Sequence, residues 1–180
     1  MKVLLVGAYP PPYGGVQVHL VQLEQYLESL GHSCFIINMG KNKALQNSKI
    51  VSPRSALGVA YELFRRRDHV CHLHFGGVLH VRLLMLGLLA DFLFYKRSAI
   101  TVHSGGLSVW QQPRGLLRRL LLQGCFGLCG AVICVNPEIA QYFKELGVKA
   151  ERIYVLSAFA YAGGKSEGSL PEPVGSFVAE

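Results

Sequence analysis

The sequence predicts a single α/β domain built on a doubly wound parallel sheet. Short apolar runs rich in β-branched residues alternate along the chain with longer segments whose apolar residues recur at helical spacing. The short runs are continuously apolar, as expected of strands that are covered on both faces. Strands connected through helices form right-handed crossovers within one sheet, so the expected architecture is Rossmann-like.

Six strands are expected, each a short apolar run. They lie at residues 2–7, 34–38, 70–74, 99–102, 131–135 and 153–156. Cys34, Cys71 and Cys134 fall within these runs and are predicted to be small buried apolar residues. The chain has five cysteines and no Cys-x-x-C pair, which fits reduced thiols in a reducing compartment better than a disulfide framework.

Five helices are expected between and after these strands, at residues 16–30, 55–67, 79–95, 114–129 and 137–146. The first carries one apolar stripe, made by Val16, Leu20, Leu23, Leu27 and Leu30, and Gly31 is a suitable C-terminal stop. The second closes on the sequence FRRR at 64–67, where cations complement the negative end of the helix dipole.

The third expected helix is the most apolar segment of the chain, but Arg82 and Asp91 interrupt it. Its unbroken core LLMLGLLA is far shorter than the roughly 20 residues that a spanning helix needs, so no transmembrane segment is expected. The N-terminal apolar run stops at a proline cluster without a small-residue cleavage site, so it is not a signal peptide. We therefore expect a cytoplasmic protein.

The fourth expected helix combines leucines with Arg114, Arg118 and Arg119 near one end. Burial against the sheet accounts for its leucines, which are Leu116, Leu117, Leu120 and Leu121. The alternative is an interfacial helix that contacts anionic lipid, which would place the protein peripherally on the inner face of the membrane.

The end of the chain changes in composition. The sequence AGGKSEGSLPEP is small, polar and rich in proline, which is typical of a linker, and PVGSFVAE can begin a further helix. We expect residues 1–160 to form the Rossmann-like domain, and residues 161–180 to form a linker and the start of an interdomain helix.

Composition limits the partners of the domain. Hydrophobic residues make up 51% of the chain and charged residues 16%, which excludes an intrinsically disordered protein. The formal net charge of +7 suits phosphate, anionic lipid or nucleic acid. Aromatic residues are not interleaved with arginine as a platform for single-stranded nucleic acid requires, so no nucleic-acid partner is expected.

Three glycine pairs follow predicted strands, at 14–15, 76–77 and 105–106. Ligands of an open parallel sheet bind outside the carboxyl ends of its strands, which is where these pairs lie. Glycine lacks the β-carbon that would hold a ligand away from the main chain. A single pair fits a tight turn equally well, whereas three pairs on one edge indicate a crevice lined by backbone.

The loop after the first strand is the most unusual of the three. Its prolines at 10–12 stiffen the exit from the strand, and Gly14 and Gly15 then lead into the first helix. The free N–H groups and positive dipole end of that helix favour a phosphate by roughly 0.3–1 kcal/mol. Neither the G-x-G-x-x-G fingerprint of dinucleotide-binding proteins nor a P-loop occurs in the chain.

His103 ends the fourth predicted strand, where a polar side chain would point into the crevice. Its imidazole can hydrogen-bond a sugar hydroxyl or titrate near neutrality, and the alternative is a structural hydrogen bond to a neighbouring loop. His74 has the equivalent place on the third strand. The sequence CHLH at 71–74 does not predict a metal site, because Cys71 and Leu73 face one way and His72 and His74 the other.

Five stretches carry a resemblance to a known family: YPPPYGGVQVHL, LESLGHSC, HLHFGG, TVHSGG and VICVNPEIAQYFKELGVKAERIYVLSAF. In this order they resemble the N-terminal half of a family 4 glycosyltransferase with the GT-B fold. The resemblance covers essentially the whole chain, and the proline-rich Gly-Gly loop is its most specific part.

The resemblance implies transfer of a sugar from a nucleotide sugar to a glycan or lipid-linked acceptor, with retention of configuration and without a metal or other cofactor. Similar enzymes often build bacterial cell-surface polysaccharides. Gly14 and Gly15 would lie against the donor diphosphate and the acceptor, and His103 would approach the transferred sugar. The family's nucleotide-sugar site belongs to a C-terminal Rossmann domain beyond these 180 residues, so the chain is expected to hold the acceptor side and to be inactive alone.

We therefore expect His103 to be the catalytic residue. The expected substrate contacts come from Tyr13, Gly14, Gly15, His74, Gly76, Gly105 and Asn136. The alternative function is a non-catalytic α/β binding module that docks on a partner or on a membrane through its apolar and basic surface.

Overall fold

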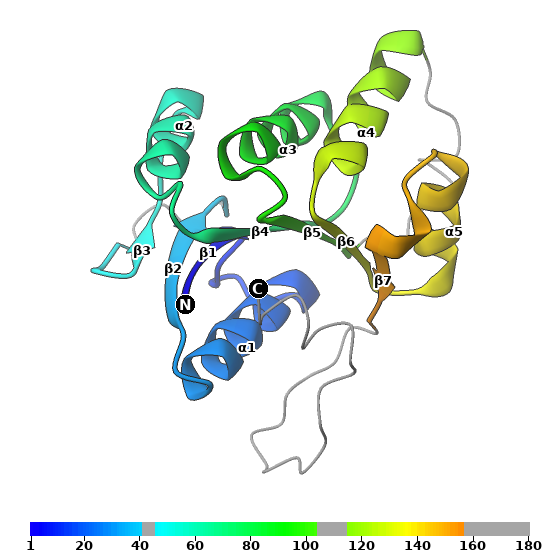
Figure 1. The fold of residues 1–180 in the computed structure, drawn as a ribbon. Helices are drawn as coiled ribbons and strands as arrows, with labels where there is room; N and C mark the ends of the chain where they lie inside the picture. The colour runs from blue at the N-terminus through cyan, green and yellow to red at the C-terminus, as the bar shows by residue number, and fades with distance from the viewer. Residues whose placement is uncertain (41–45, 104–114, 157–180) are drawn as a thin grey trace.

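The computed structural model describes residues 1–40, 46–103 and 115–156, and its centre is one parallel sheet (Figure 1). The seven strands have the order β3-β2-β1-β4-β5-β6-β7, and every neighbouring pair is parallel. They are β1 Lys2–Gly7, β2 Ser33–Asn38, β3 Ile50–Val51, β4 Val70–Phe75, β5 Ser98–Val102, β6 Ala131–Cys134 and β7 Ile153–Val155. The predicted fold class and all six predicted strands are confirmed. The expected linker at 161–180 lies outside the described residues.

The sequence did not reveal β3, which pairs with β2 at the edge of the sheet. Ile50 and Val51 are its only members, so the strand is too short to give a periodic signal. Ile50 is nevertheless buried, because it packs beside Ile36 in the sheet.

All five expected helices are present, with ends within two residues of the prediction. They are α1 Gly15–Ser29, α2 Ala56–Arg65, α3 Val81–Phe94, α4 Leu116–Leu128 and α5 Pro137–Glu145, followed by a short 3-10 turn, η2 Ala150–Arg152. Gly31 ends α1 as predicted, with a φ of 81°, and the N–H groups of Gly31 and His32 donate to the carbonyls of Glu28 and Leu27. This is the Schellman pattern, in which a left-handed residue satisfies the last helical carbonyls.

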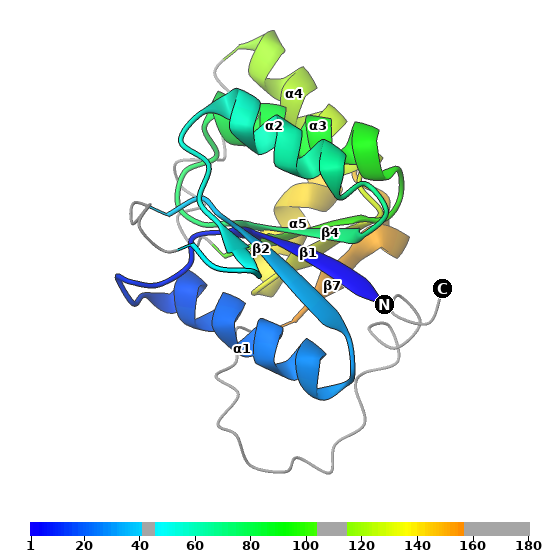
Figure 2. The ribbon, with the colours of Figure 1, turned by 90° about the vertical axis from the view of Figure 1, so that its left-hand side faces the viewer.

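The helices cover both faces of the sheet, as a doubly wound fold requires. Helix α1 lies along one face, and α2, α3 and α4 lie along the other (Figures 1 and 2). Alternate residues of β1 enter the two cores: Leu4 and Val6 join the cluster under α2–α4, whereas Val3 and Leu5 pack in the cluster that includes Leu20 of α1. The larger cluster also contains four of the five buried cysteines as small apolar side chains.

The fourth helix corrects one expectation. Leu116, Leu117 and Leu120 are 73%, 70% and 55% exposed, so the prediction that they are buried against the sheet is wrong. The buried stripe of α4 is formed by Leu122, Cys125 and Phe126, and one turn earlier the same stripe falls on the arginines at 118 and 119. The three leucines therefore lie beside the stripe and face away from the core.

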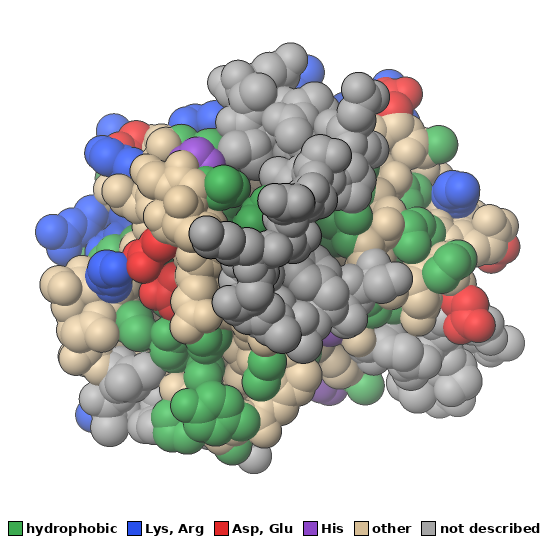
Figure 3. All heavy atoms as spheres, turned by 90° about the horizontal axis from the view of Figure 1, so that it is seen from below, with side chains coloured by type: hydrophobic (Ala, Val, Ile, Leu, Met, Phe, Trp, Pro, Cys, Tyr) green, Lys and Arg blue, Asp and Glu red, His purple; other side chains and the backbone are tan. Residues whose placement is uncertain are grey.

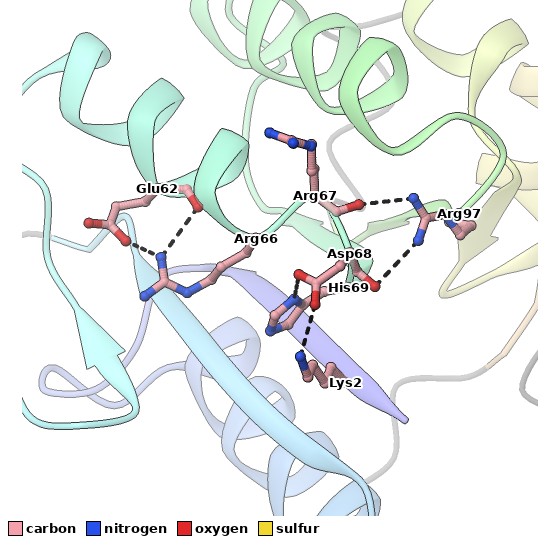
Figure 4. Close-up of polar contacts among 7 residues, drawn as sticks. All are labelled: Lys2, Glu62, Arg66, Arg67, Asp68, His69 and Arg97. Atoms are coloured by element: carbon pink, nitrogen blue, oxygen red, sulfur yellow. Dashed lines mark hydrogen bonds and ion pairs between the residues drawn. The ribbon is translucent and has the colours of Figure 1, made fainter.

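Polar contacts fix the amino-terminal edge of the sheet (Figure 4). The carboxylate of Asp68, just before β4, accepts from Lys2 of β1 at 2.9 Å and lies 2.8 Å from His69. The Arg97 guanidinium donates to the carbonyl oxygens of Arg67 at 2.9 Å and Asp68 at 3.3 Å. Exposed pairs of this kind add little stability, so their main effect is to hold the turn before β4 against β1 and β5.

Helix α3 carries a buried carboxylic acid, Asp91, in the layer formed by α2, α3 and α4. Asp91 of α3 accepts a hydrogen bond from the Ser98 hydroxyl at 2.6 Å, and its second oxygen has no hydrogen-bond partner among the described residues. Burial raises the pKa of Asp91 to about 7, against the smaller opposing effect of the Ser98 bond. The thiols that face it, of Cys71, Cys125 and Cys129, have pKa values raised by burial and stay neutral over this range.

Stability should therefore depend on the ionisation of Asp91. The pKa of Asp91 is higher in the folded chain than in the unfolded chain, where it lies near 3.8. The stabilisation by the neutral carboxyl group is therefore complete below that pH and is lost as the pH rises to about 7. In urea titrations we compare the free energy of unfolding of the Asp91→Asn variant with that of the wild type. Between pH 4 and pH 8 this difference should shift in favour of the variant by on the order of 3 kcal/mol. A difference that does not change with pH would show that the carboxyl group is already ionised at pH 4.

Among the described residues, no helix combines the length and the apolar character needed to cross a bilayer.

Candidate functional site

A cavity of about 350 Å³ opens at the carboxyl-terminal edge of the sheet. Its walls come from the ends of β1 and β4 and from the helices that follow these strands. The lining residues include Gly7, Ala8, Val16, Gln17, His74, Gly76, Gly77, Leu83 and Leu86. The ends of β1 and β4 thus meet at one place, and of the three predicted glycine pairs Gly76 and Gly77 line the cavity.

Two glycines allow the close packing behind this cavity. A β-carbon on Gly7 would lie 2.7 Å from Leu20 Cδ1 and 3.0 Å from His74 Cβ, and one on Gly76 would lie 2.9 Å from Val16 Cγ2. Contacts below 3.0 Å are sterically excluded, so these positions accept no larger residue without a shift. The glycines therefore bring β1, β4 and the start of α1 together.

The first turn of α1 borders the cavity with free backbone donors. The residue before the helix, Gly14, is extended, no side chain caps it, and the first turn carries no acidic residue. Val16 and Gln17 line the cavity, whereas Gly14 and Gly15 lie just before them in the chain. A β-carbon on Gly15 would meet no atom within 4 Å, so this backbone is open to an approaching group.

Next to the cavity, four imidazoles form a row on the face of the sheet that α1 covers. His72 and His74 of β4 have ring centroids 4.3 Å apart, and His74 lies 5.4 Å from His103, which follows β5. His19 of α1 completes the row, 4.8 Å from His103 and 5.6 Å from His74. Small areas of histidine side chain are visible on this side of the molecule (Figure 3).

Specific hydrogen bonds orient these rings. His74 Nδ1 lies 3.1 Å from His103 Nε2, and His72 Nε2 lies 2.7 Å from the Thr101 hydroxyl. The backbone N–H of His103 donates to the Phe75 carbonyl at 2.8 Å, which continues the pairing of β4 and β5 beyond the last strand residue. His74 and His103 are therefore held side by side at the ends of adjacent strands.

Burial makes these imidazoles neutral. It lowers the pKa of His103 to about 4 and that of His72 to about 3, and it lowers the pKa of His19 and His74 in the same direction. Of the two roles given for His103, the lowered pKa favours a hydrogen bond over titration near neutrality. At pH 7 the ring can donate or accept a hydrogen bond but carries no charge.

The structure brings together some of the predicted site residues and separates others. His74, His103 and Gly76 lie at the cavity or in the histidine row. Tyr13 is 78% exposed on the loop before α1, and the Asn136 side chain accepts from the Ile139 N–H as the cap of α5. Gly105 lies outside the described residues.

His19 was not predicted as a site residue. Its signal was present, since it lies three residues after Val16 and four before Leu23, which belong to the apolar stripe of α1. The facing directions predicted for CHLH are confirmed, because Cys71 and Leu73 join the core beneath α2–α4 and the two histidines face α1.

Comparison with known proteins places the fold in a wider group. Residues 13–158 match the profile described as Glycosyltransferase Family 4. Among solved structures, the UDP-N-acetylglucosamine 2-epimerase from Rickettsia bellii is similar, with a TM-score of 0.55 and 13% sequence identity. The match covers 99% of this chain and 48% of that protein, so the chain spans about half of its length, and at this identity the likeness concerns the fold alone. No curated protein matched the sequence.

Proposed function

Because the chain belongs to glycosyltransferase family 4, we propose that it is the acceptor-binding half of a retaining glycosyltransferase. The reaction would move a sugar from a nucleotide sugar to a glycan or lipid-linked acceptor. One observation supports the assignment of the site: the cavity, the open start of α1 and the neutral His103 all lie at the same edge of the sheet. Clefts at this edge are the usual ligand sites of open parallel sheets.

The site offers two kinds of recognition. Backbone N–H groups at the start of α1 would stabilise the charge of the donor diphosphate as it departs, at a helix end without a competing acidic residue. The neutral imidazole of His103 would hydrogen-bond a hydroxyl of the transferred sugar and hold it in position. Neither role requires a nucleophile from this chain or a change in the protonation of His103.

The nucleotide of the donor would bind mainly to a second Rossmann-like domain, since the chain matches 48% of a neighbour with a similar fold. The test begins with the coding sequence beyond codon 180, where we expect another alternation of strands and helices that contains a pair of glutamates. The protein made from the whole gene is then incubated with labelled nucleotide sugars and extracts of lipid and glycan acceptors.

The expected result is an acceptor that carries the label with the anomeric configuration of the donor, as determined by NMR. A downstream sequence of unrelated composition would count against the proposal. So would a whole-gene product that alters the nucleotide sugar but never transfers it to an acceptor.

A second candidate function, docking on a membrane, is favoured by the surface of α4. Leu116, Leu117 and Leu120 are exposed beside Arg118 and Arg119, a combination typical of helices that lie in the interface of anionic bilayers. The first turn of α4 contains no acidic residue that would oppose such binding.

We expect the chain to co-sediment with vesicles that contain anionic lipid and to remain in solution with zwitterionic vesicles. Replacing Leu116 and Leu117 by serine should reduce the bound fraction several-fold, because the helix then loses most of its exposed apolar surface. The matched control is Leu128→Ser at the far end of α4, where a 60% exposed leucine stands apart from the arginines. Equal binding by all three proteins would place the membrane contact elsewhere. Vesicle binding together with a whole-gene product inactive in transfer would favour the non-catalytic alternative.

A further inference from the structure

Three histidines from separate parts of the chain converge on one point. His19 comes from α1, His74 from β4 and His103 from the residue after β5, and their ligand nitrogens all lie within 4.8 Å of one another. From this convergence we propose that the three imidazoles bind a divalent transition-metal ion, with Zn²⁺ as the best fit. The metal site shares His103 with the proposed transfer site, but its test does not need that activity.

The spacing of two of the nitrogens is close to that of a metal site. Imidazole nitrogens bind zinc at about 2.0–2.1 Å in tetrahedral geometry, so two of them on one ion are about 3.3 Å apart. His74 Nδ1 and His103 Nε2 are 3.1 Å apart. The third ligand, His19, would have to move its ring by about 1.5 Å at most, which a side-chain rotation at the half-buried position on α1 can supply.

One polar atom of His74 lacks a hydrogen-bond partner among the described residues. His74 is 5% exposed, and its Nε2 atom has no hydrogen-bond partner among the described residues. A buried polar atom without a partner costs about 1–3 kcal/mol, and such atoms commonly mark a missing ligand or ion. His74 also lines the cavity, so an ion bound to either of its nitrogens would lie beside that space.

The chemistry of the ligands selects the ion. A neutral imidazole carries a lone pair on one of its nitrogens, and burial favours the neutral form of all three rings at pH 7. Nitrogen ligands favour Zn²⁺ and its neighbours, whereas Mg²⁺ and Ca²⁺ require oxygen ligands. Three protein ligands leave a fourth tetrahedral position for water or another small ligand.

The test is titration of the 180-residue chain with Co²⁺, whose visible absorption reports tetrahedral nitrogen coordination, followed by displacement with Zn²⁺. We expect one equivalent to bind. His19→Gln and His103→Gln should each weaken binding at least about tenfold, since even indirect partners of a metal ligand contribute that much. His80→Asn is the matched control, because this exposed histidine before α3 is outside the cluster and should leave the affinity unchanged.

Circular dichroism of each variant shows whether it is folded. His19→Gln places a good helix former on a half-buried position of α1, so this variant decides the question if His103→Gln does not fold. The proposal is overturned if the folded wild type binds no Co²⁺, if binding is the same in His19→Gln, or if the spectrum shows thiolate coordination by the cysteines.

Discussion

Replacing Gly130 by alanine should remove a large part of the stability of the domain. A β-carbon at this position would lie 2.1 Å from the Lys96 carbonyl oxygen, 2.8 Å from the Lys96 carbonyl carbon and 3.0 Å from the Ser98 oxygen. All three are backbone atoms, so no side-chain rotation can relieve the overlap. The Gly130 N–H also donates to the Ser98 carbonyl at 2.9 Å, and that bond joins the turn after α4 to the start of β5.

The clash forces the turn between α3 and β5 away from β6, because both strands begin at this contact. We expect Gly130→Ala to lower the free energy of unfolding by about 3 kcal/mol or more, a large part of the roughly 5–15 kcal/mol that holds a typical domain folded. Equilibrium unfolding in urea, followed by circular dichroism, measures the loss.

The matched control is Gly127→Ala, three residues earlier in α4. A β-carbon there would meet no atom within 4 Å, and the helical position favours alanine over glycine by about 1 kcal/mol. The two variants should therefore change stability in opposite directions. A small effect of Gly130→Ala would mean that the turn at Lys96 moves more easily than its backbone contacts indicate.

If His103 positions the transferred sugar as proposed, His103→Ala should lower the kcat of the whole-gene product by about 100-fold or more, because alanine cannot make that hydrogen bond. His103→Gln should recover part of this loss, since an amide can donate or accept one hydrogen bond in place of the imidazole. His80→Ala, which alters an exposed histidine before α3, should leave the rate unchanged.

The assays should be run with EDTA, so that any metal bound to the histidines does not contribute. Because the pKa of His103 lies at about 4, the wild-type rate should show no titration of this group between pH 6 and pH 8. Wild-type activity in His103→Ala, with the protein folded and the chelator present, would remove this residue from the reaction.

The fold was predictable because its strands are covered on both faces. Runs such as residues 3–6 and 131–135 are apolar throughout, and the helices between the strands carry apolar stripes. The prediction failed where a pattern was short or ambiguous. Two residues of β3 cannot show a period, and a leucine-rich helix such as α4 does not reveal which of its leucines face the core until the partner helix is known.

The site was partly predictable for a similar reason. Parallel strands present their carboxyl ends at one edge, so Gly76, His74 and His103 could be assigned there without coordinates. The participation of His19 depends on how α1 packs across β1 and β4, which rests on the close contacts of Gly7 with Leu20 and His74. The pKa of His103 depends on burial by residues distant in sequence, so the sequence shows the imidazole but not its protonation state.

Helix α1 is the one helix among the described residues that packs on its face of the sheet, over the smaller of the two apolar clusters. Regions with fewer buried contacts open at a lower free energy than the rest of a domain, as amide hydrogen exchange reveals. The amides of α1 should therefore exchange with solvent sooner than those of α3. Each local opening of α1 would expose the four imidazoles while the strands beneath them stay paired. A bulky ligand could then reach that edge of the sheet without unfolding of the domain.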